Sequence, residues 1–531
     1  MTSLMGDFFS RDYYSVLFAV VVVALGILLN YTVRSAQGIS DLLRGSKKKH
    51  SWKENKEPLQ TSRCSICETL LVTVESFYCD MCGVCADVQC LKKANNTVKC
   101  KRMFTEVIGP LKHSYIKGNL PVGSECAVCH EECGHDFRCI WCHMTVHINC
   151  KKMLAEKCDT GKYKNFIIPP SSVVQTFHRI NIGRVSVTHE IREPEWSQNR
   201  WTPLFVLISR KSGSKFGGEV ISAFRGILNP LQVIVLGEQD PSLLCQWLDL
   251  LPESAQPIVL VGSGDGGIAW VLTTLHKLQK KKYPPVGIIP LGTGNDLSRV
   301  LNWGSKITTP FSVQEYLEHL QKAKEGYLDR WEVNYKVFKR RGLSLNRPHQ
   351  YFMYNYLSIG VDALVALNFH ETRNNRSYLF GSQLRNKLMY LIFGTQQVLD
   401  RECKGLEAFI ELYLDDERID IPELEAIIVL NIQRYGGGVD LWNLSSGCDS
   451  NQYPRQAIND EKIEIASAAS SFQLAQFQLG LSEPTKLGQA KKVKLVLKKR
   501  IPMQIDGEPW MQPPGQIEIT FANQARVLLK D

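Results

Sequence analysis

Hydrophobic and polar positions change their spacing along the chain. Between residues 203 and 301, short β-branched apolar runs alternate with segments whose apolar residues recur at helical spacing. This alternation of strand and helix predicts an α/β domain built on a parallel sheet. The expected strands are residues 203–208, 231–236, 258–261 and 286–289.

Beyond residue 301 the pattern becomes richer in strands. Segments of strand-like composition follow one another, and turn residues separate most of them, which predicts a second, mostly antiparallel and sandwich-like β-rich domain. The expected strands lie within 330–337, 351–359, 406–414, 426–432 and 493–497. Residues 162–200 contain Pro169, Pro170 and Pro194 and are expected to form a polar connection.

A long uncharged segment stands near the N-terminus. Residues 13–33 carry no charge and are apolar throughout 16–29, enough to cross a bilayer core of about 30 Å. A cleaved signal peptide is the alternative, but it would need a basic start and a small-residue cleavage site, and neither is clear. We therefore expect a single-pass membrane anchor, with endoplasmic reticulum or plasma membrane as its location.

Charge supports a membrane partner. The chain has 63 Lys and Arg against 53 Asp and Glu, a net charge of +10, which favours an anionic partner. Basic residues cluster directly after the apolar segment, so the bulk of the chain is expected in the cytosol, against an anionic lipid surface rather than nucleic acid. They are Arg34, Arg44, Lys47, Lys48, Lys49, Lys53 and Lys56. The sequence leaves the oligomeric state open.

Cysteine spacing predicts metal sites. All but three of the 17 cysteines lie between residues 64 and 158, and in a cytosolic segment such pairs indicate zinc rather than disulfides. Modules this small bury too little apolar surface to fold well without metal. The expected ligands of the first module are His50, Cys64, Cys67, Cys79, Cys82, Asp87, Cys90 and Cys100. Those of the second are His113, Cys126, Cys129, Cys139, Cys142, His147, Cys150 and Cys158.

Two glycine-rich turns follow expected strands. Glycines let a phosphate approach the backbone N–H groups at a helix start, and two such turns about 25 residues apart favour phosphate binding more strongly than one. Neither turn matches a P-loop or a dinucleotide motif. Asp265 is well placed to hold Mg²⁺ or a hydroxyl. The expected nucleotide-binding residues are Ser263, Gly264, Asp265, Gly266, Gly292, Thr293, Gly294, Asn295 and Asp296.

These turns resemble the catalytic core of the diacylglycerol kinase and sphingosine kinase superfamily. The usual first motif of that family is GGDGT, and here Ser263 replaces its first glycine and Gly267 its threonine. The resemblance implies ATP and Mg²⁺ as cofactors, with Asp265 and Asp296 supporting the metal. It also implies nucleotide contacts from the turn after the first strand, which consists of Lys211, Ser212 and Gly213.

The β-rich region resembles the diacylglycerol kinase accessory region. Its Asp506-Gly507-Glu508 segment implies Asp506 as catalytic base and Glu508 as its neighbour or metal partner, with Asp265 completing the catalytic set. Both carboxylates are expected to point the same way from an extended segment. An ordinary Asp-Gly surface turn is the alternative. The resemblance further implies that Asp362 contacts a substrate hydroxyl.

The cysteine-rich modules resemble the phorbol-ester-type zinc finger of protein kinase C. That family interleaves its ligands and holds two structural zinc ions per finger. The resemblance implies one ion on His113, Cys139, Cys142 and Cys158, and another on Cys126, Cys129, His147 and Cys150. Whether either finger binds diacylglycerol stays open, and we expect structural or regulatory roles.

The order of these parts resembles diacylglycerol kinases of the epsilon type. The expected parts are an anchor (1–34), a basic linker (35–49), two fingers (50–101 and 112–158), a linker (159–199), a catalytic domain (200–335) and an accessory domain (336–531). The resemblance implies phosphorylation of 1,2-diacylglycerol to phosphatidic acid, attenuating diacylglycerol signalling and feeding phosphatidylinositol turnover, with arachidonoyl preference. The alternatives are a catalytically silent, membrane-tethered diacylglycerol sensor, or a kinase for a sphingoid base.

Overall fold

The structure is a computed structural model of the 531-residue chain. It describes residues 50–55, 62–104, 109–181, 184–197, 201–212, 216–277, 283–338, 349–375, 403–443 and 453–531. The anchor and basic linker expected within residues 1–49 lie outside this part of the chain. Within the described ranges, no helix combines the length and the apolar character needed to cross a membrane.

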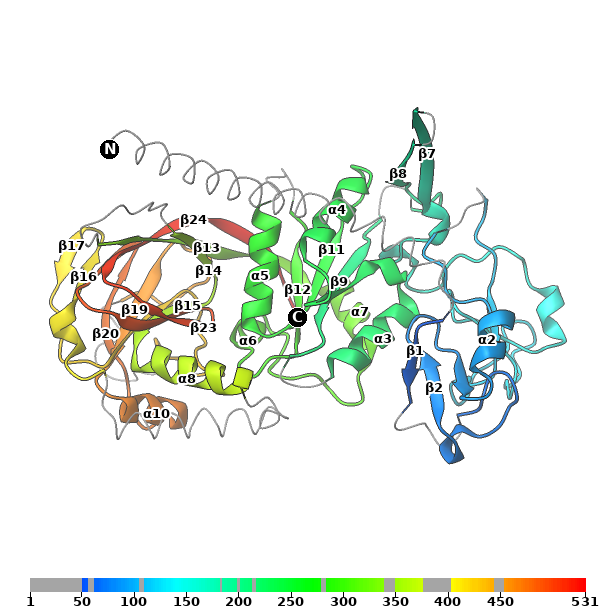
Figure 1. The fold of residues 1–531 in the computed structure, drawn as a ribbon, viewed down its shortest axis with the longest axis horizontal. Coiled ribbons are helices and arrows are strands. Elements are labelled where there is room, and N and C mark those ends of the chain that lie inside the picture. Colours follow the sequence, from blue (N-terminus) through cyan, green and yellow to red (C-terminus); the bar gives the residue numbers. More distant parts are fainter. Residues whose placement is uncertain are drawn as a thin grey trace, which may run out of the picture.

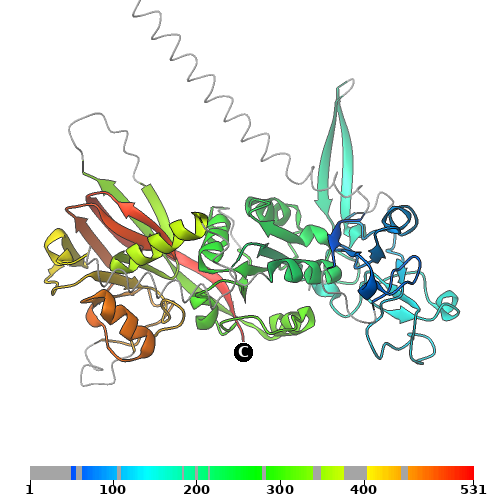
Figure 2. The same ribbon diagram turned by 60° about the horizontal axis from the view of Figure 1, so that its bottom comes forward.

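The molecule is arranged as three parts in a row (Figure 1). The two cysteine-rich modules lie at one end, the α/β domain lies in the middle, and the β-rich domain lies at the other end. Figure 2 shows the same order from a second direction. The C-terminus lies in the middle part, beside a strand that precedes it in the sequence by more than 200 residues.

The α/β domain contains the predicted parallel strands. Each is almost wholly buried, which requires helices on both faces, and this explains why the strands appear in the sequence as continuous apolar runs. Helix α3 packs with α7, and α4 packs with α5. In sheet order the strands are β10 (Val233–Leu236), β9 (Leu204–Ser209), β11 (Ile258–Ser263) and β12 (Val286–Pro290). The helices are α3 (Gly217–Ile227), α4 (Ser242–Leu250), α5 (Asp265–His276), α6 (Asp296–Val300) and α7 (Val313–Lys322).

The last strand of the chain completes this sheet. Strand β24 (Gly515–Leu529) pairs parallel to β12, with Val527 opposite Val286. It also pairs antiparallel with β13 (Lys324–Val337) along its whole length. The sheet of the α/β domain therefore continues across residue 335 into the β-rich domain, and the two domains share one hydrogen-bonded layer.

The β-rich domain is a sandwich, as the strand pattern predicts. One layer is the continuation of the ten-stranded sheet, and the other is a six-stranded sheet in the order β20-β19-β18-β15-β22-β23. Alternate side chains such as Val493, Leu495 and Leu497 point into a common core between them. The strands are β14 (His349–Met353), β15 (Tyr356–Gly360), β16 (Ile410–Leu414), β17 (Glu417–Ile419), β18 (Ala426–Leu430), β19 (Ile463–Ala468), β20 (Thr485–Ala490), β21 (Lys492–Leu497), β22 (Ile501–Ile505) and β23 (Glu508–Gln512).

In the part of the chain that the structure describes, helices α8 (Val361–Asn375) and α10 (Ser471–Leu479) cover the six-stranded sheet and contact each other. They pack through Val361, Leu364 and Phe477 against Ile428. Burial on this second face explains why β18 is apolar at every position.

The connection expected at residues 162–200 differs from its prediction. It contains an antiparallel hairpin of β7 (Val173–Asn181) and β8 (Arg184–Ile191), with Val173 opposite Ile191. The hairpin projects from the body of the molecule (Figure 2). Pro169 and Pro170 precede the first strand and Pro194 follows the second, and the β-branched residues between them favour the extended conformation.

Each cysteine-rich module contains a small three-stranded sheet. The first has β1 (Trp52–Glu54), β2 (Ser76–Cys79) and β3 (Cys85–Asp87), followed by α2 (Leu91–Thr97). The second has β4 (Tyr115–Lys117), β5 (Phe137–Cys139) and β6 (Thr145–Val146).

Both modules dock on the C-terminal end of α3. The ammonium of Lys101 is buried and donates to the carbonyl oxygens of Arg225, Gly226 and Ile227 at 2.7–3.2 Å. It also lies 4.5 Å from the centre of the Trp141 ring of the second module. A cation at this position satisfies carbonyls that the helix leaves unpaired and complements its dipole.

A buried ion pair joins the same helix end to the first module. The guanidinium of Arg225 lies 2.8 Å from the Asp80 carboxylate. His143 of the second module contacts the Gly226 carbonyl at 3.2 Å. The helix whose N-terminus follows the Lys211 turn is therefore held at its other end by both modules.

Candidate active site and metal centres

The predicted phosphate-binding turns meet at one edge of the parallel sheet. Strands β9, β11 and β12 are neighbours and run in the same direction, so the segments after their carboxyl ends lie side by side. Lys211 and Ser212 follow β9, while Gly213 lies outside the part of the chain that the structure describes. This edge is where an open α/β sheet ordinarily binds its ligand.

The two glycine turns touch each other through their backbones. A Cβ on Gly264 would lie 3.1 Å from the Cα of Gly292, and a Cβ on Gly292 would lie 2.7 Å from Oδ1 of Asn295. The N–H of Leu291 also donates to the carbonyl of Ser263 at 3.2 Å. Glycine is required here because two turns could not approach this closely with side chains between them.

Asn295 holds the second turn in shape. It adopts a left-handed conformation with φ 54°, and its side chain is fully buried. Its carboxamide oxygen accepts from the N–H of Gly292 at 2.8 Å, and its amide donates to the carbonyls of Gly292 and Ser305. The side chain of Asn295 therefore positions the turn, and its role in nucleotide binding stays a prediction.

Two carboxylates, the buried Asp296 and the half-buried Asp265, face each other across these turns. Asp265 accepts from the N–H groups of Asp296 at 3.2 Å and Leu297 at 3.1 Å, and Asp296 accepts from Gly437 at 3.0 Å. A Cβ on Gly294 would lie 3.4 Å from an oxygen of each carboxylate. Burial and the neighbouring Asp265 raise the pKa of Asp296 to about 7, and burial raises that of Asp265.

This carboxylate pair suits a divalent cation. Two like charges in a buried site repel each other, and a cation between them would remove that cost. Beside them lies the buried carboxamide of Asn355. Among the residues that the structure describes, neither of its polar atoms has a hydrogen-bond partner, although it lies near enough to lower the pKa of Asp265. The side-chain oxygen of Asn355 is therefore available as a further ligand atom for a bound cation. The sequence carried no signal for Asn355, because asparagine is common before any strand.

Asp506 and Gly507 form a tight hairpin turn instead of the expected extended segment. Their φ values are 49° and 85°, and they connect β22 to β23. Unlike an ordinary surface turn, this one buries its aspartate. Asp506 accepts three backbone N–H groups at 2.8–3.0 Å, from residues 354, 355 and 356. Burial, opposed by these N–H groups, raises the pKa of Asp506 to about 7.

Glu508 has different surroundings. It is exposed, and a Cβ on Gly266 would lie 2.9 Å from its Oε1. The Glu508 carboxylate therefore reaches the first turn of α5, one residue from Asp265, where the helix dipole favours negative charge. The structure brings Asp265, Asp296 and the pair Asp506 and Glu508 together from three separate segments of the chain.

Asp362 lies in the first turn of α8. Its carboxylate accepts from the Ser358 hydroxyl at 2.5 Å and from the amide of Gln504, and all three side chains are buried. The Asp362 carboxylate is therefore already occupied by two hydrogen-bond donors, and a substrate hydroxyl would have to share it with them.

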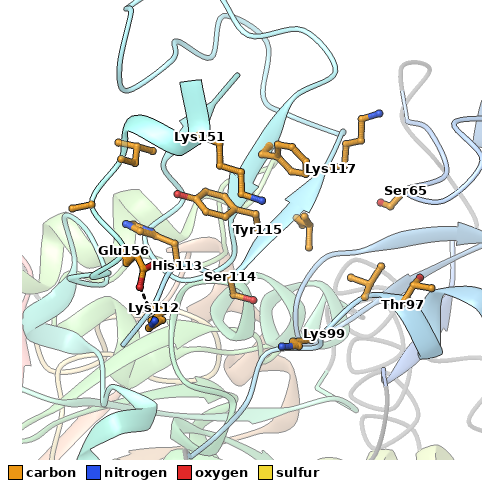
Figure 3. A pocket seen from close by; sticks show the side chains of 15 residues that line it. Ser65, Thr97, Lys99, Lys112, His113, Ser114, Tyr115, Lys117, Lys151 and Glu156 are labelled. Atoms are coloured by element: carbon orange, nitrogen blue, oxygen red, sulfur yellow. Dashed lines mark hydrogen bonds and ion pairs between the residues drawn. The ribbon is translucent and has the colours of Figure 1, made fainter. Parts of the chain in front are cut away.

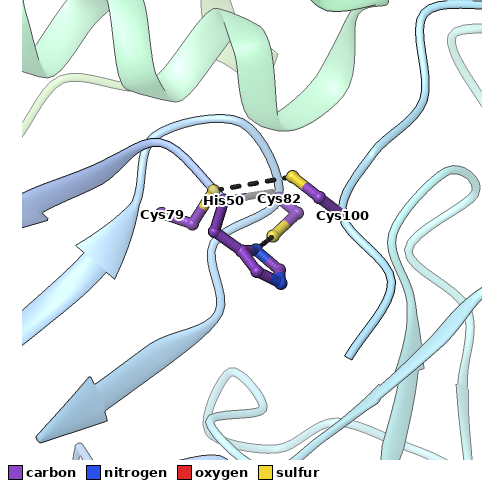
Figure 4. A group of neighbouring side chains, drawn as sticks. All are labelled: His50, Cys79, Cys82 and Cys100. Carbon is purple, nitrogen blue, oxygen red and sulfur yellow. Dashed lines mark hydrogen bonds between the residues drawn. The ribbon is translucent and has the colours of Figure 1, made fainter. Parts of the chain in front are cut away.

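The expected metal ligands gather into four groups. Within each group the ligand atoms lie within 4.8 Å of one another. Figure 4 shows His50, Cys79, Cys82 and Cys100 pointing toward a common centre, with Cys82 Sγ 3.2 Å from His50 Nδ1. The others are Cys64, Cys67, Asp87 and Cys90; His113, Cys139, Cys142 and Cys158; and Cys126, Cys129, His147 and Cys150. Thiolate and imidazole groups in fours suit tetrahedral zinc, and the interleaving is the one that the finger resemblance implies.

Comparisons with known proteins agree with this site. The family "Diacylglycerol kinase catalytic domain" matches residues 203–326, and the family "Diacylglycerol kinase accessory domain" matches residues 352–509. The chain is 32% identical over 503 residues to a Caenorhabditis elegans protein named "Probable diacylglycerol kinase 3", covering 88% of this chain and 62% of that protein's length. Diacylglycerol kinase 2 of Arabidopsis thaliana is 29% identical, with 91% of this chain and 86% of that protein covered.

Similarity to solved structures is weaker. A diacylglycerol kinase from Bacillus anthracis aligns with a TM-score of 0.36 and 13% identity, covering 62% of this chain and 96% of that one. The assignment therefore depends on the matched families, the sequence relatives and the site itself. The chain contains a diacylglycerol kinase catalytic domain followed by a diacylglycerol kinase accessory domain, the two domains of a lipid kinase.

Proposed function

We propose that the protein transfers the γ-phosphate of ATP to the free hydroxyl of 1,2-diacylglycerol and so forms phosphatidic acid and ADP. The observation that carries the proposal is the convergence of Asp265, Asp296 and Glu508 beside two glycine turns at the carboxyl edge of the sheet. Phosphoryl transfer requires a neutralised phosphate and a positioned hydroxyl, and this edge offers groups for both.

The glycine turns and the carboxylate pair form the nucleotide side of the site. Backbone N–H groups at the starts of α5 and α6 would bind phosphate oxygens, because the glycines leave the backbone open. Asp265 and Asp296, with the Asn355 oxygen, would hold Mg²⁺, which neutralises phosphate charge when bound. Lys211 and Ser212 lie at the same edge and would contact the nucleotide.

The hydroxyl side of the site belongs to the Asp-Gly-Glu turn. Asp506 is occupied by three backbone N–H groups, which makes it a positioning residue for the turn and for residues 354–356. Glu508 is exposed and free to meet a substrate, so we assign it the proton of the attacking hydroxyl. This assignment reverses the roles that the sequence alone implies for the two carboxylates.

The remaining parts would keep the enzyme at its substrate. The four ligand groups would hold zinc, two ions per finger, and residues 13–33 would anchor the chain with its catalytic domain in the cytosol. Anchoring raises the effective concentration of a substrate that never leaves the bilayer. The order of the parts supports an epsilon-type enzyme. The proposed preference for arachidonoyl chains is supported by that resemblance alone and by no residue of the site.

Transfer of labelled γ-phosphate tests the proposal. The full chain is assayed in mixed micelles that offer diacylglycerol and sphingosine together, with Asp265→Ala as the inactive variant and Asp415→Ala, at an exposed β16–β17 turn, as its control. Labelled phosphatidic acid that disappears only in Asp265→Ala is the expected result. Labelled sphingosine would identify a sphingoid-base kinase. No labelled lipid from folded protein would identify a silent diacylglycerol sensor.

A further inference from the structure

A cavity of about 570 Å³ lies between the two cysteine-rich modules, away from the kinase site. The first module contributes the segment 97–99 and Ser65, and the second contributes 112–117, Phe137, Lys151 and 154–156. Figure 3 shows side chains from both modules around it. The function proposed above uses none of these residues except His113, which belongs to a metal group.

The cavity is strongly basic. Four lysines line it, Lys99, Lys112, Lys117 and Lys151, against a single glutamate, Glu156. Glu156 lies 2.6 Å from Lys112, but both side chains are more than two-thirds exposed, so this ion pair is weak and easily exchanged. Lys117 is paired with Glu68, which lies outside the cavity lining, so the charges of Lys99 and Lys151 are the ones that favour an anion with several oxygens.

The wall behind these lysines is apolar. Val98, Ile116, Phe137 and Leu154 line the cavity together with Tyr115. The ammonium of Lys151 lies 4.8 Å from the centre of the Tyr115 ring and 4.4 Å from that of Phe137, which fixes one charge against the aromatic surface. A cavity with cations at its rim and an apolar wall suits an amphiphile better than a free ion.

The modules hold the cavity open between them. Asn119 of the second module exchanges two hydrogen bonds with the backbone of Arg63 in the first, at 2.7 and 2.8 Å. Lys117 forms a 2.6 Å ion pair with Glu68 across the same boundary. Both modules are also fixed to α3. These contacts therefore hold the two sides of the cavity together in the structure.

We propose that this cavity binds the headgroup of an anionic phospholipid, with a phosphate monoester as the preferred group. The lysines would surround the phosphate, and the upper part of the acyl chains would lie against the apolar wall. A monoester carries more charge than a phosphodiester at neutral pH, so it makes fuller use of lysines from both modules. A free phosphate carries the same charge but has no acyl chains to pack against the apolar wall of the cavity.

Calorimetric titration of the full chain in a neutral detergent tests the proposal. The probes are dihexanoylphosphatidic acid, dihexanoylphosphatidylserine and glycerol 3-phosphate. We expect the phosphatidic acid to bind most tightly, and Lys99→Gln with Lys112→Gln to weaken it about tenfold. The matched control is Lys92→Gln with Lys93→Gln, two exposed lysines on α2 outside the cavity.

Each other outcome would overturn a stated part of the proposal. Equal losses in the two double variants would show that general surface charge binds the lipid. Glycerol 3-phosphate that binds as tightly as the lipid would remove the role of the apolar wall. A photoreactive phosphatidic acid should label residues 112–117, and labelling confined to the kinase domain would place the ligand elsewhere. Leaving out ATP prevents turnover, and the lysine variants together with the photolabelling separate this cavity from product binding at the proposed kinase site.

Discussion

The side chain of Ser263 fills the space into which a side chain at Gly267 would project. A Cβ on Gly267 would lie 2.8 Å from the Cβ of Ser263 and closer still to its hydroxyl. These are the two positions at which the chain departs from the GGDGT pattern. The departures therefore compensate each other, because one hydroxyl has moved from the start of α5 to the end of β11 and still lies in the same place.

This exchange predicts a rescue. Gly267→Thr alone should clash with Ser263 and lower kcat about tenfold or more, because overpacking a tight site costs about 1–3 kcal/mol. Ser263→Gly combined with Gly267→Thr rebuilds the GGDGT pattern and should recover most of the activity. Initial rates and KM for ATP of the two single variants and the double variant form the measurement. A double variant no better than Gly267→Thr would show that the two positions are independent.

The carboxylate pair predicts a pH-dependent effect of Mg²⁺. The pKa of Asp296 is raised to about 7, so the folded protein holds this proton more tightly than the unfolded chain does. Metal-free stability should then fall as pH rises from about 4 to about 7, where the buried charge forms. Mg²⁺ should restore it, so the Mg²⁺-induced rise in Tm should be larger at pH 8 than at pH 6.

Asp296→Asn supplies the control for that experiment. The variant keeps the shape of the side chain but removes the charge, so its Tm without Mg²⁺ should be higher at pH 8 than that of the unchanged protein. Its response to Mg²⁺ should be small at both pH values. An unchanged Mg²⁺ response in Asp296→Asn would place the cation away from this pair.

The two carboxylates of the hairpin turn should fail in different ways. Asp506→Asn turns an amide group toward three N–H donors, so it should lower thermal stability together with kcat, as the loss of a buried charge-assisted network does. Glu508→Gln should leave the Tm unchanged and lower kcat by about 10²–10⁴-fold, as expected for a lost proton acceptor. A folded but inactive Asp506→Asn beside an active Glu508→Gln would return the base role to Asp506.

The buried ammonium of Lys101 should stabilise the end of α3. Lys101→Met removes the hydrogen-bond donor to three carbonyls. It should raise the rate of hydrogen exchange over residues 217–227 and lower the free energy of unfolding by about 2 kcal/mol or more. Lys93→Met, an exposed position on α2, is the matched control and should change neither quantity. Equal exchange in both variants would show that the modules do not support the helix.

Metal removal should depend on which group is emptied. Three residues that contact α3 each come immediately after a metal ligand in the sequence. Asp80 follows Cys79, Lys101 follows Cys100 and His143 follows Cys142, and these ligands belong to two of the four groups. Cys82→Ser should therefore expose the α3 boundary to protease and release zinc. Cys67 belongs to a group whose ligands are not followed by any of these three residues. Cys67→Ser should therefore release zinc while the boundary between the modules and α3 stays protected from protease.

Much of the fold was visible in the sequence, for physical reasons. Strands β9, β11 and β12 are buried on both faces, so they appear as unbroken apolar runs, and glycines mark their ends. The metal groups were predictable because ligand chemistry fixes both residue type and spacing. The sequence also marked the two turns and the Asp-Gly-Glu segment, which the structure brings together, while their roles in binding and catalysis stay predictions.

The remaining features depend on contacts between distant residues. Asn355 gains its importance only from burial beside Asp265, 90 positions away, and nothing in its local sequence reports this. The different surroundings of Asp506 and Glu508 arise from the hairpin turn and from N–H groups about 150 residues earlier. The β7–β8 hairpin was missed because the prolines before it resemble a linker.

The pairing of β24 with β12 also determines when the enzyme can form during synthesis. Strand β24 follows β12 by more than 200 residues, so it is synthesised well after the strand whose edge it covers. Until then β12 presents an unpaired edge, which is open to wrong partners. A fragment limited to residues 203–326 would keep that edge permanently, and we expect it to aggregate where the full chain stays dispersed. The sheet that positions Asp265 and Asp296 is therefore closed by a strand made after the Asp-Gly-Glu turn, so both sides of the site are completed at the same stage of synthesis.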